Sequence, residues 1–228
     1  MLVAADSGLA MFHGATMHNT TLSEYLARDF SKEIPDATSM RPEAALSIVN
    51  RRYTSFVDLE FFDRLTHLPE ALAGSYSIRY ARDISVNDLK SSNAILSGSQ
   101  DANPWLELFE PQMNFVLHDD LINHVRAFSN RKPNPGEQAL YTCGPYEYGV
   151  LSYLPNLSNT GNVLLVEGTS VAGTQAISDF LFVDKSLDSF LAKIALPDGS
   201  IPHFEILLES RNFNGSASQS EIVAYRLH

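Results

Sequence analysis

The chain has one cysteine in 228 residues, Cys143, so no disulfide can form within it. Cysteine usage therefore leaves the redox compartment open, and we interpret the single thiol as a small buried hydrophobic side chain rather than a nucleophile. No stretch approaches the ~18 consecutive apolar residues that a membrane-spanning helix needs. The first ten residues also lack a basic segment followed by a long apolar core, so no signal peptide is recognisable.

Basic residues are scarce: 16 Lys and Arg stand against 27 Asp and Glu, which gives a formal net charge of −11. Binding to nucleic acid or to an anionic membrane surface needs a basic face, so we expect no nucleic-acid partner. With 44% hydrophobic and 19% charged residues, the chain can bury a full core. No repeat or linker divides it, and residues 1–228 are predicted to form a single α/β domain. The opening MLVAADSG has the composition of a cut into a longer protein, so we interpret the chain as an excerpt.

Motifs for nucleotide binding and for nucleophilic catalysis are absent. Gly168 and Gly173 do not form G-x-G-x-x-G, and no G-x-x-x-x-G-K-[ST] is present. Ser99 follows a glycine, but the second glycine of G-x-S-x-G is missing. The seven histidines are scattered, and the closest pair, His13 and His18, is weak evidence for a metal. We therefore predict no metal, no cofactor and no catalytic residue.

The most informative stretch runs from Gly161 to Phe182. Asn162–Val166 is a short apolar run, typical of a strand that is covered on both faces. Gly168 ends it, and Thr169 or Ser170 can cap a following helix by accepting a backbone N–H. Small residues in the first turn let this helix either pack close to the sheet or leave its N-terminus open to an anion. Apolar side chains follow at helical spacing: Val171, Ala172, Ala176, Ile177, Phe180 and Leu181.

The rest of the chain favours a three-layer α/β domain with a mixed sheet, similar to a Rossmann-like fold or to one lobe of a periplasmic binding protein. Further strands are predicted at Ser7–His13, Tyr76–Tyr80, Asn93–Ser97, Met113–Leu117, Tyr148–Leu154, Phe204–Leu208 and Ile222–Tyr225. Helices are predicted from Thr20 or Thr21 to Phe30, at Pro42–Asn50, at Leu59–Leu72 behind an Asp58 cap and with a break at Pro69, from Ser85 or Asn87 to Lys90, at Pro104–Phe109 and at Leu187–Leu196.

Two hairpins and one irregular region are also predicted. The strands Tyr148–Leu154 and Asn162–Val166 are joined by a short turn and should pair. Asn214-Gly215 predicts the turn of a second hairpin near the end of the chain. The segment His118–Pro145 is rich in proline, glycine and asparagine, and we expect it to consist mainly of loops.

Two strand ends are predicted to carry the binding chemistry, because ligands of α/β sheets bind beyond the carboxyl ends of the strands. If the two strands are neighbours, their loops face each other across a cleft. Hydroxyls, amides and backbone N–H groups would line this cleft, and an indole would supply a flat apolar wall. The predicted ligand-binding residues are Ser97, Ser99, Asn103, Trp105, Glu167, Gly168, Thr169 and Ser170.

Several of these residues have a structural alternative. Asn103 can cap the helix that follows it, and Trp105 can belong to the core. Gly168 can be present only because the strand-to-helix turn has no room for a side chain, without contacting a ligand. Glu167 directly follows a buried strand and is the best single candidate for a general acid or base.

Two segments, Asn93–Trp105 and Tyr148–Leu181, resemble a family of uncharacterised proteins from acidobacteria and other soil bacteria. The matching positions are Asn103, Trp105, Gly168, Gly173 and Thr174. Members of that family often carry this domain after a single membrane helix, sometimes with a winged-helix DNA-binding domain ahead of it. The resemblance implies an extracytoplasmic sensor domain, with a cytoplasmic location as the alternative, and it implies no catalytic residue.

The first functional hypothesis is a non-catalytic, ligand-sensing or interaction domain of a membrane-anchored bacterial signalling protein. Its partner would be a small molecule, and it would meet the membrane only through a segment outside this chain. The alternative is a small-molecule hydrolase or transferase that uses Glu167 as acid or base. A third hypothesis is a structural or oligomerisation domain without a ligand, and the sequence leaves open whether a homodimer forms.

Overall fold

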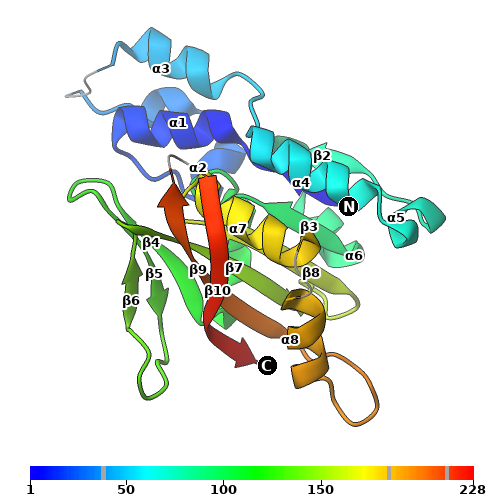
Figure 1. Cartoon of the computed structure of the whole chain (residues 1–228). Coiled ribbons are helices and arrows are strands. Elements are labelled where there is room, and N and C mark those ends of the chain that lie inside the picture. The colour runs from blue at the N-terminus through cyan, green and yellow to red at the C-terminus, as the bar shows by residue number, and fades with distance from the viewer. Residues whose placement is uncertain (37–39, 184–185, 214–215) are drawn as a thin grey trace.

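The computed structural model describes residues 1–36, 40–183, 186–213 and 216–228. Its centre is a seven-stranded sheet with the strand order β10-β9-β7-β8-β3-β1-β2 (Figure 1). Strands β8, β3, β1 and β2 are parallel, whereas β7, β9 and β10 are added antiparallel. The predicted α/β class with a mixed sheet is therefore confirmed. The strands are β1 Leu2–Ala4, β2 Ile78–Tyr80, β3 Ala94–Ser97, β7 Tyr146–Pro155, β8 Asn162–Gly168, β9 Phe204–Phe213 and β10 Ser216–Leu227.

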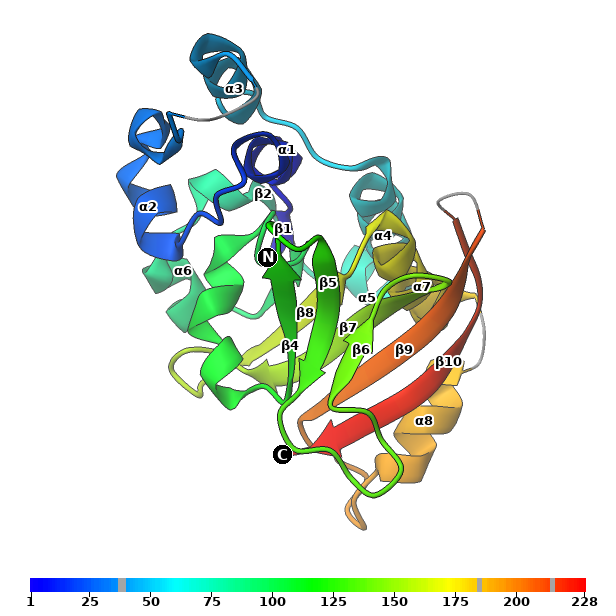
Figure 2. The same cartoon turned by 90° about the vertical axis from the view of Figure 1, so that its left-hand side faces the viewer.

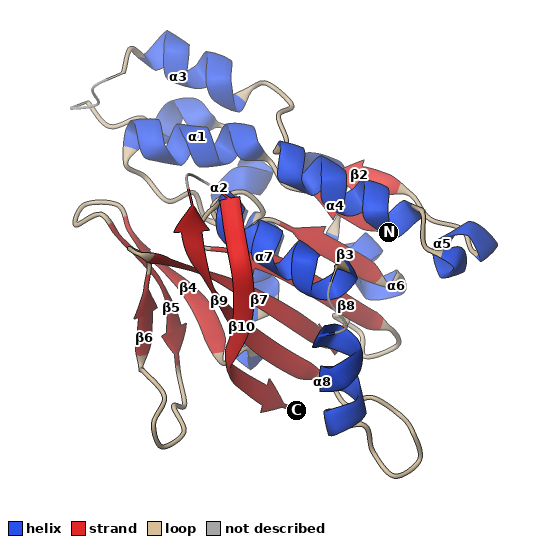
Figure 3. Ribbon diagram, viewed as in Figure 1, coloured by secondary structure: helices blue, strands red, loops and turns tan. Residues whose placement is uncertain are grey.

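Helices and a second sheet cover the two faces of the main sheet. On one face, α4, α7 and α8 pack on one hydrophobic cluster, as Figure 3 shows. On the other face, α1, α2, α6 and a three-stranded antiparallel sheet share a second hydrophobic cluster, to which α3 adds from its place against α1 (Figure 2). The helices are α1 Ser7–Thr16, α2 Leu22–Ala27, α3 Pro42–Val49, α4 Phe56–Thr66, α5 Pro69–Ala73, α6 Val86–Ser91, α7 Val171–Phe182 and α8 Ser186–Ile194. None of the helices in these described ranges has the length and apolar content needed to cross a bilayer.

Local capping signals place most helix starts where the sequence predicted them. Thr21 and Ser85 each form a capping box, at α2 and α6. Pro42 occupies the first turn of α3, and the predicted break at Pro69 separates α4 from α5. The Asp58 cap is wrong, because the Ser55 hydroxyl accepts the Asp58 N–H and α4 begins earlier, at Phe56.

The predicted strand Ser7–His13 is wrong, because this segment forms most of α1. The Asp6 carboxylate accepts the Leu9 N–H and caps the helix, and the buried residues Leu9, Phe12, His13 and Thr16 recur at helical spacing. The strand instead precedes it: Leu2–Ala4 is β1, between β3 and β2. Three residues are too few to show a period, so only pairing with neighbours reveals this strand.

The predicted loop region His118–Pro145 is also wrong in large part, since it contains much of the small sheet. Its strands are β4 Phe115–Asp120, β5 Val125–Asn130 and β6 Leu140–Thr142. The prolines and glycines lie between and after these strands, where turns are needed. The predicted helix Pro104–Phe109 is a 3₁₀ helix, Pro104–Leu108.

Each of the two predicted hairpins corresponds to a pair of antiparallel strands, β7 with β8 and β9 with β10. The predicted pairing of Tyr148–Leu154 with Asn162–Val166 is confirmed by the register of β7 and β8. Strands β9 and β10 also pair, but the predicted turn at Asn214-Gly215 lies outside the described residues.

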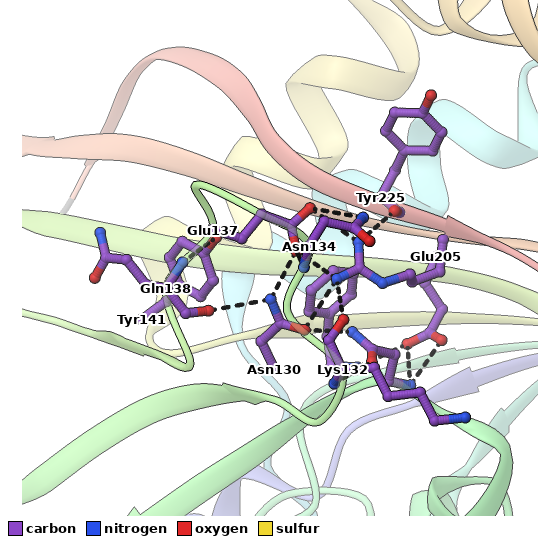
Figure 4. A network of polar contacts seen from close by, with 11 residues as sticks. Asn130, Lys132, Asn134, Glu137, Gln138, Tyr141, Glu205 and Tyr225 are labelled. Atoms are coloured by element: carbon purple, nitrogen blue, oxygen red, sulfur yellow. Dashed lines mark hydrogen bonds and ion pairs between the residues drawn. The ribbon is translucent and has the colours of Figure 1, made fainter.

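A polar network ties the loop between β5 and β6 to the last strand (Figure 4). Arg226 of β10 forms a two-pronged ion pair with Glu137 and donates to the Lys132 carbonyl at 2.7 Å. Asn130 donates to the same Glu137 carboxylate at 2.9 Å. The ion pair with Arg226 is the largest cause that lowers the Glu137 pKa, to about 2. This network holds the small sheet against the main sheet.

Candidate functional site

Three parallel strands, β1, β3 and β8, end side by side, and a cavity of about 360 Å³ opens beyond their carboxyl ends. This volume falls within the range of small-molecule sites. Its hydroxyl-bearing lining residues are Ser7, Ser55, Ser99, Thr169, Ser170 and Thr174. Its charged lining residues are Asp58, Asp101 and Arg126, and the other residues that line it are glycine, alanine and valine.

The two predicted loops do face each other, because β3 and β8 are paired neighbours. The Ser99 hydroxyl donates to the Gly168 carbonyl at 2.7 Å and accepts the Gly168 N–H at 3.0 Å. Gly98 N donates to the Val166 carbonyl at 3.0 Å, which continues the contact between the strands past the end of β3. The sequence predicted a shared cleft only if the two strands were neighbours, and β3 and β8 are neighbours.

Glycines bring the start of α7 directly onto the sheet. A Cβ on Gly168 would lie 2.4 Å from the Thr174 nitrogen, and one on Gly173 would lie 2.2 Å from the Tyr148 carbonyl oxygen. Gly98, on the opposite loop, has a φ of +92° and approaches Ala5 closely. Of the two arrangements that the small residues permitted, the close packing of α7 is the one formed.

Ser170 is the residue that caps α7, since its hydroxyl accepts the Ala172 N–H at 3.2 Å. Thr169, the other candidate cap, instead donates to Glu147 at 2.7 Å and accepts the Tyr148 N–H at 3.0 Å. Both residues line the cavity, together with Ser99 and Gly168.

Three predicted site residues lie behind the cavity wall. Ser97 is fully buried and donates to Asp58. Asn103 is also buried, donates to the Ser97 carbonyl at 3.0 Å and does not cap the 3₁₀ helix. Trp105 is only 1% exposed, and its indole N–H donates to the Ala81 carbonyl at 2.8 Å. The expectation that Trp105 forms a flat wall of the cleft is therefore wrong, and its core alternative is correct.

Glu167 is 2% exposed and points into the core on the face of β8 that packs against the small sheet. It does not line the cavity, and its Oε1 has no hydrogen-bond partner among the described residues. Burial raises the Glu167 pKa well above its usual value, and repulsion from Glu110 and Glu205 adds to the shift. This shift favours the neutral form of the Glu167 carboxyl.

The charged residues of the cavity were not predicted from the sequence. Arg126 reaches the cavity from β5, and its Nη1 binds Asp101 at 3.0 Å and also binds Asp119. Asp58, in the first turn of α4, accepts the hydroxyls of Ser55 and Ser97. Ser7 was missed for the same reason as β1, because the three-residue strand that precedes it is too short to show a period.

The remaining candidate groups from the sequence are the histidines and the single cysteine. No cluster of three His, Cys, Asp or Glu within the described ranges is arranged to hold a metal ion. His13 accepts the Thr20 N–H through Nε2, and burial lowers the His13 pKa to about 4. Burial raises the pKa of the Cys143 thiol, which keeps it protonated near neutral pH.

Comparison with known proteins finds no relative. No family model matches the chain, and no curated protein and no solved structure gives a significant match. The resemblance of Asn93–Trp105 and Tyr148–Leu181 to the acidobacterial family therefore stays a prediction.

Proposed function

We propose that the chain is a ligand-sensing domain that binds a small polar molecule, without transforming it, in the cavity beyond β1, β3 and β8. The observation that carries the proposal is the convergence of three strand ends on a hollow of about 360 Å³. Its hydroxyl and backbone groups can supply directional hydrogen bonds to such a ligand. Rossmann-like folds bind ligands at the same end of a parallel sheet, and we propose the same use here.

The proposed setting is the one that the acidobacterial resemblance implies. The domain would lie outside the cytoplasm as part of a membrane-anchored bacterial signalling protein, with the output module outside this chain. Ligand binding would stabilise one arrangement of the loops around the cavity, and that difference would be the signal.

The enzyme alternative has less support. A general acid or base must come within hydrogen-bond reach of its substrate, and Glu167 is 2% exposed. Two carboxylates line the cavity. Asp58 is engaged by the hydroxyls of Ser55 and Ser97. Asp101 is paired with Arg126 at 3.0 Å.

A thermal-shift screen of a small-molecule library tests the proposal. A ligand at a hundred times its dissociation constant stabilises the folded state by about 2.7 kcal/mol. Ala10 and Val171 line the cavity, and Val171 is 52% exposed. Ala10→Phe and Val171→Phe should fill the mouth of the cavity and remove the stabilisation while the unliganded protein still folds.

Met11→Phe is the matched control, because Met11 neighbours Ala10 on α1 but is 47% exposed and does not line the cavity. This variant should keep the full ligand effect. A screen without a hit, or hits that both cavity-filling variants retain, would contradict the proposal.

A further inference from the structure

Helix α5, between α4 and β2, is exposed along its whole length. None of its five residues, Pro69–Ala73, is buried. Leu72 in this helix and Leu68 at its N-cap are both exposed. Figure 1 shows α5 at the margin of the molecule, beyond α4 and the β2 end of the main sheet. The apolar side chains of α5 therefore add to neither hydrophobic cluster of the fold.

Strand β2 leaves the neighbouring edge of the main sheet open. It ends the strand order, and no other described strand pairs with its outer side. Ile78 is the register partner of Leu2, so both side chains lie on the same face of the sheet. Leu2 is buried there in the cluster that includes Phe61 and Phe62 of α4, whereas Ile78 is exposed. The helix layer therefore covers β1 and stops short of β2.

Leu59 adds one flank of α4 to this surface. Arg64 binds Asp179 of α7 at 2.9 Å, so the flank of α4 that carries Arg64 faces α7. Leu59, five residues earlier, lies about 140° further round the helix. Because α7 lies over β7, β8 and β9, the flank with Leu59 faces the β2 end of the sheet. What we call the α5 patch consists of five exposed side chains: Leu59, Leu68, Leu72, Tyr76 and Ile78.

The α5 patch matches the apolar area that a stable dimer needs. A whole large apolar side chain presents roughly 200 Å², so exposed fractions of 37–70% leave about 500 Å² on the five residues. A standard interface buries about 800 Å² on each partner, and about 65% of a homodimer interface is apolar. Each copy in such a dimer therefore also buries about 500 Å² of apolar surface.

The charges beside the α5 patch suit a second copy of the same chain. Segment 64–79 carries two arginines and one glutamate, a formal charge of +1 in a chain of −11. Two copies therefore avoid on this face the acidic repulsion that they meet elsewhere. Glu70 and Arg79 are exposed, and neither forms an ion pair with another residue in the described ranges. In a two-fold interface each contact occurs twice, so Glu70 of each copy can bind Arg79 of the other.

We propose that the α5 patch is the interface of a symmetric homodimer, in which each copy covers the patch of the other. Edge-to-edge pairing of the two β2 strands is not the contact, because Arg79, in the middle of this three-residue strand, would lie opposite its own copy. Packing of the exposed leucines, Tyr76 and Ile78 holds the copies together. The dimer needs no ligand in the cavity, so it stands apart from the proposed sensing function.

Sedimentation velocity and light scattering over a wide range of protein concentration test the interface. At high concentration the natural chain should have twice the monomer mass of 25.2 kDa. Leu59→Asp and Leu72→Asp should each raise the dissociation constant of the dimer by about tenfold or more, because a carboxylate buried without a partner opposes association. Both side chains are exposed in the single chain, so both variants should keep the natural circular-dichroism spectrum.

Leu26→Asp is the matched control, because Leu26 is also exposed but belongs to α2, which packs on the other hydrophobic cluster. This variant should remain dimeric. A natural chain that stays monomeric at the highest concentration would overturn the proposal. A dimer that survives both Leu59→Asp and Leu72→Asp, or that Leu26→Asp dissociates equally, would also overturn it.

Discussion

Ser99 and Gly168 are hydrogen-bonded to each other in both directions, with the serine hydroxyl 2.7 Å from the glycine carbonyl oxygen and 3.0 Å from the glycine nitrogen. Both residues lie at the carboxyl ends of neighbouring parallel strands, and both line the cavity. A single hydroxyl thus pairs with both the N–H and the carbonyl of Gly168, beyond the last β3–β8 pair, Ser97 with Val166. It also sets the spacing between the two loops.

Replacing this hydroxyl should destabilise the protein. Ser99→Ala leaves the Gly168 N–H and carbonyl unpaired in a buried site, and we expect a loss of about 2 kcal/mol in the free energy of unfolding. Urea denaturation measures it. Ser91→Ala is the control, since Ser91 donates to the Asn87 carbonyl on the exposed side of α6, and it should change stability by less than about 0.5 kcal/mol. Equal losses in the two variants would show that the Ser99 contact has no special role.

Gly168 should not tolerate even a methyl group. In Gly168→Ala the new Cβ would lie 2.4 Å from the Thr174 nitrogen and 2.5 Å from the Ser170 carbonyl oxygen. Because both are backbone atoms of the α7 start, relief needs the helix to move, and we expect a loss of about 3 kcal/mol.

Gly14→Ala is the opposite case. Gly14 lies in α1, and an added methyl group would have nothing within 4 Å of it, so alanine should stabilise the helix by about 0.5–1 kcal/mol. Thermal unfolding of both variants checks the pair. A tolerated alanine at position 168 would contradict the close packing of α7 on β8.

Asp6 should be among the most sensitive charged residues. It is fully buried, pairs with Arg82, and accepts the Tyr80 hydroxyl at 2.6 Å and the Tyr25 hydroxyl at 3.2 Å. Asp6→Asn leaves the guanidinium without its anion, and a loss of about 3–5 kcal/mol is expected.

The surface pair of Asp83 with Arg52 provides the comparison, because its side chains are 37% and 62% exposed. Asp83→Asn should lose about 1 kcal/mol or less, since solvent screens exposed pairs. Chemical denaturation of the two variants at one ionic strength measures the difference. Similar losses would contradict a special role for the buried pair.

Glu167 should make stability fall as the pH rises. Burial raises the Glu167 pKa in the folded state. The contribution of Glu167 to the free energy of unfolding is therefore fully present below its unfolded-state pKa near 4.5, and it is lost as the pH rises through the folded-state pKa. Glu167→Gln replaces the neutral acid by a neutral amide. We expect the variant to gain stability relative to the natural chain between pH 5 and pH 8.

Melting temperatures at the two pH values measure this gain. Glu60→Gln is the control, because Glu60 is exposed on α4, and its effect should be the same at both values. A Glu167→Gln effect that does not change with pH would show that folding does not raise the Glu167 pKa.

Much of the local structure could be read from the sequence because the signals act within one turn. The caps Thr21, Ser85 and Ser170 and the helix-starting Pro42 depend only on their nearest neighbours. The strand end at Gly168 was recognisable for the same reason. Leu2–Ala4 was not, since three residues carry no period, and its role follows from pairing with β3 and β2.

The sequence by itself determined the α/β class, the two strand-end loops and the glycine turn before α7. These follow from hydrophobic runs and backbone geometry that adjacent residues impose. Only the tertiary structure decided that Trp105 is core, that Glu167 points away from the cavity, and that Arg126 reaches Asp101 from another sheet. Such relations depend on strand order and on which face of a strand is covered, and a chain reveals neither until segments distant in sequence pack together.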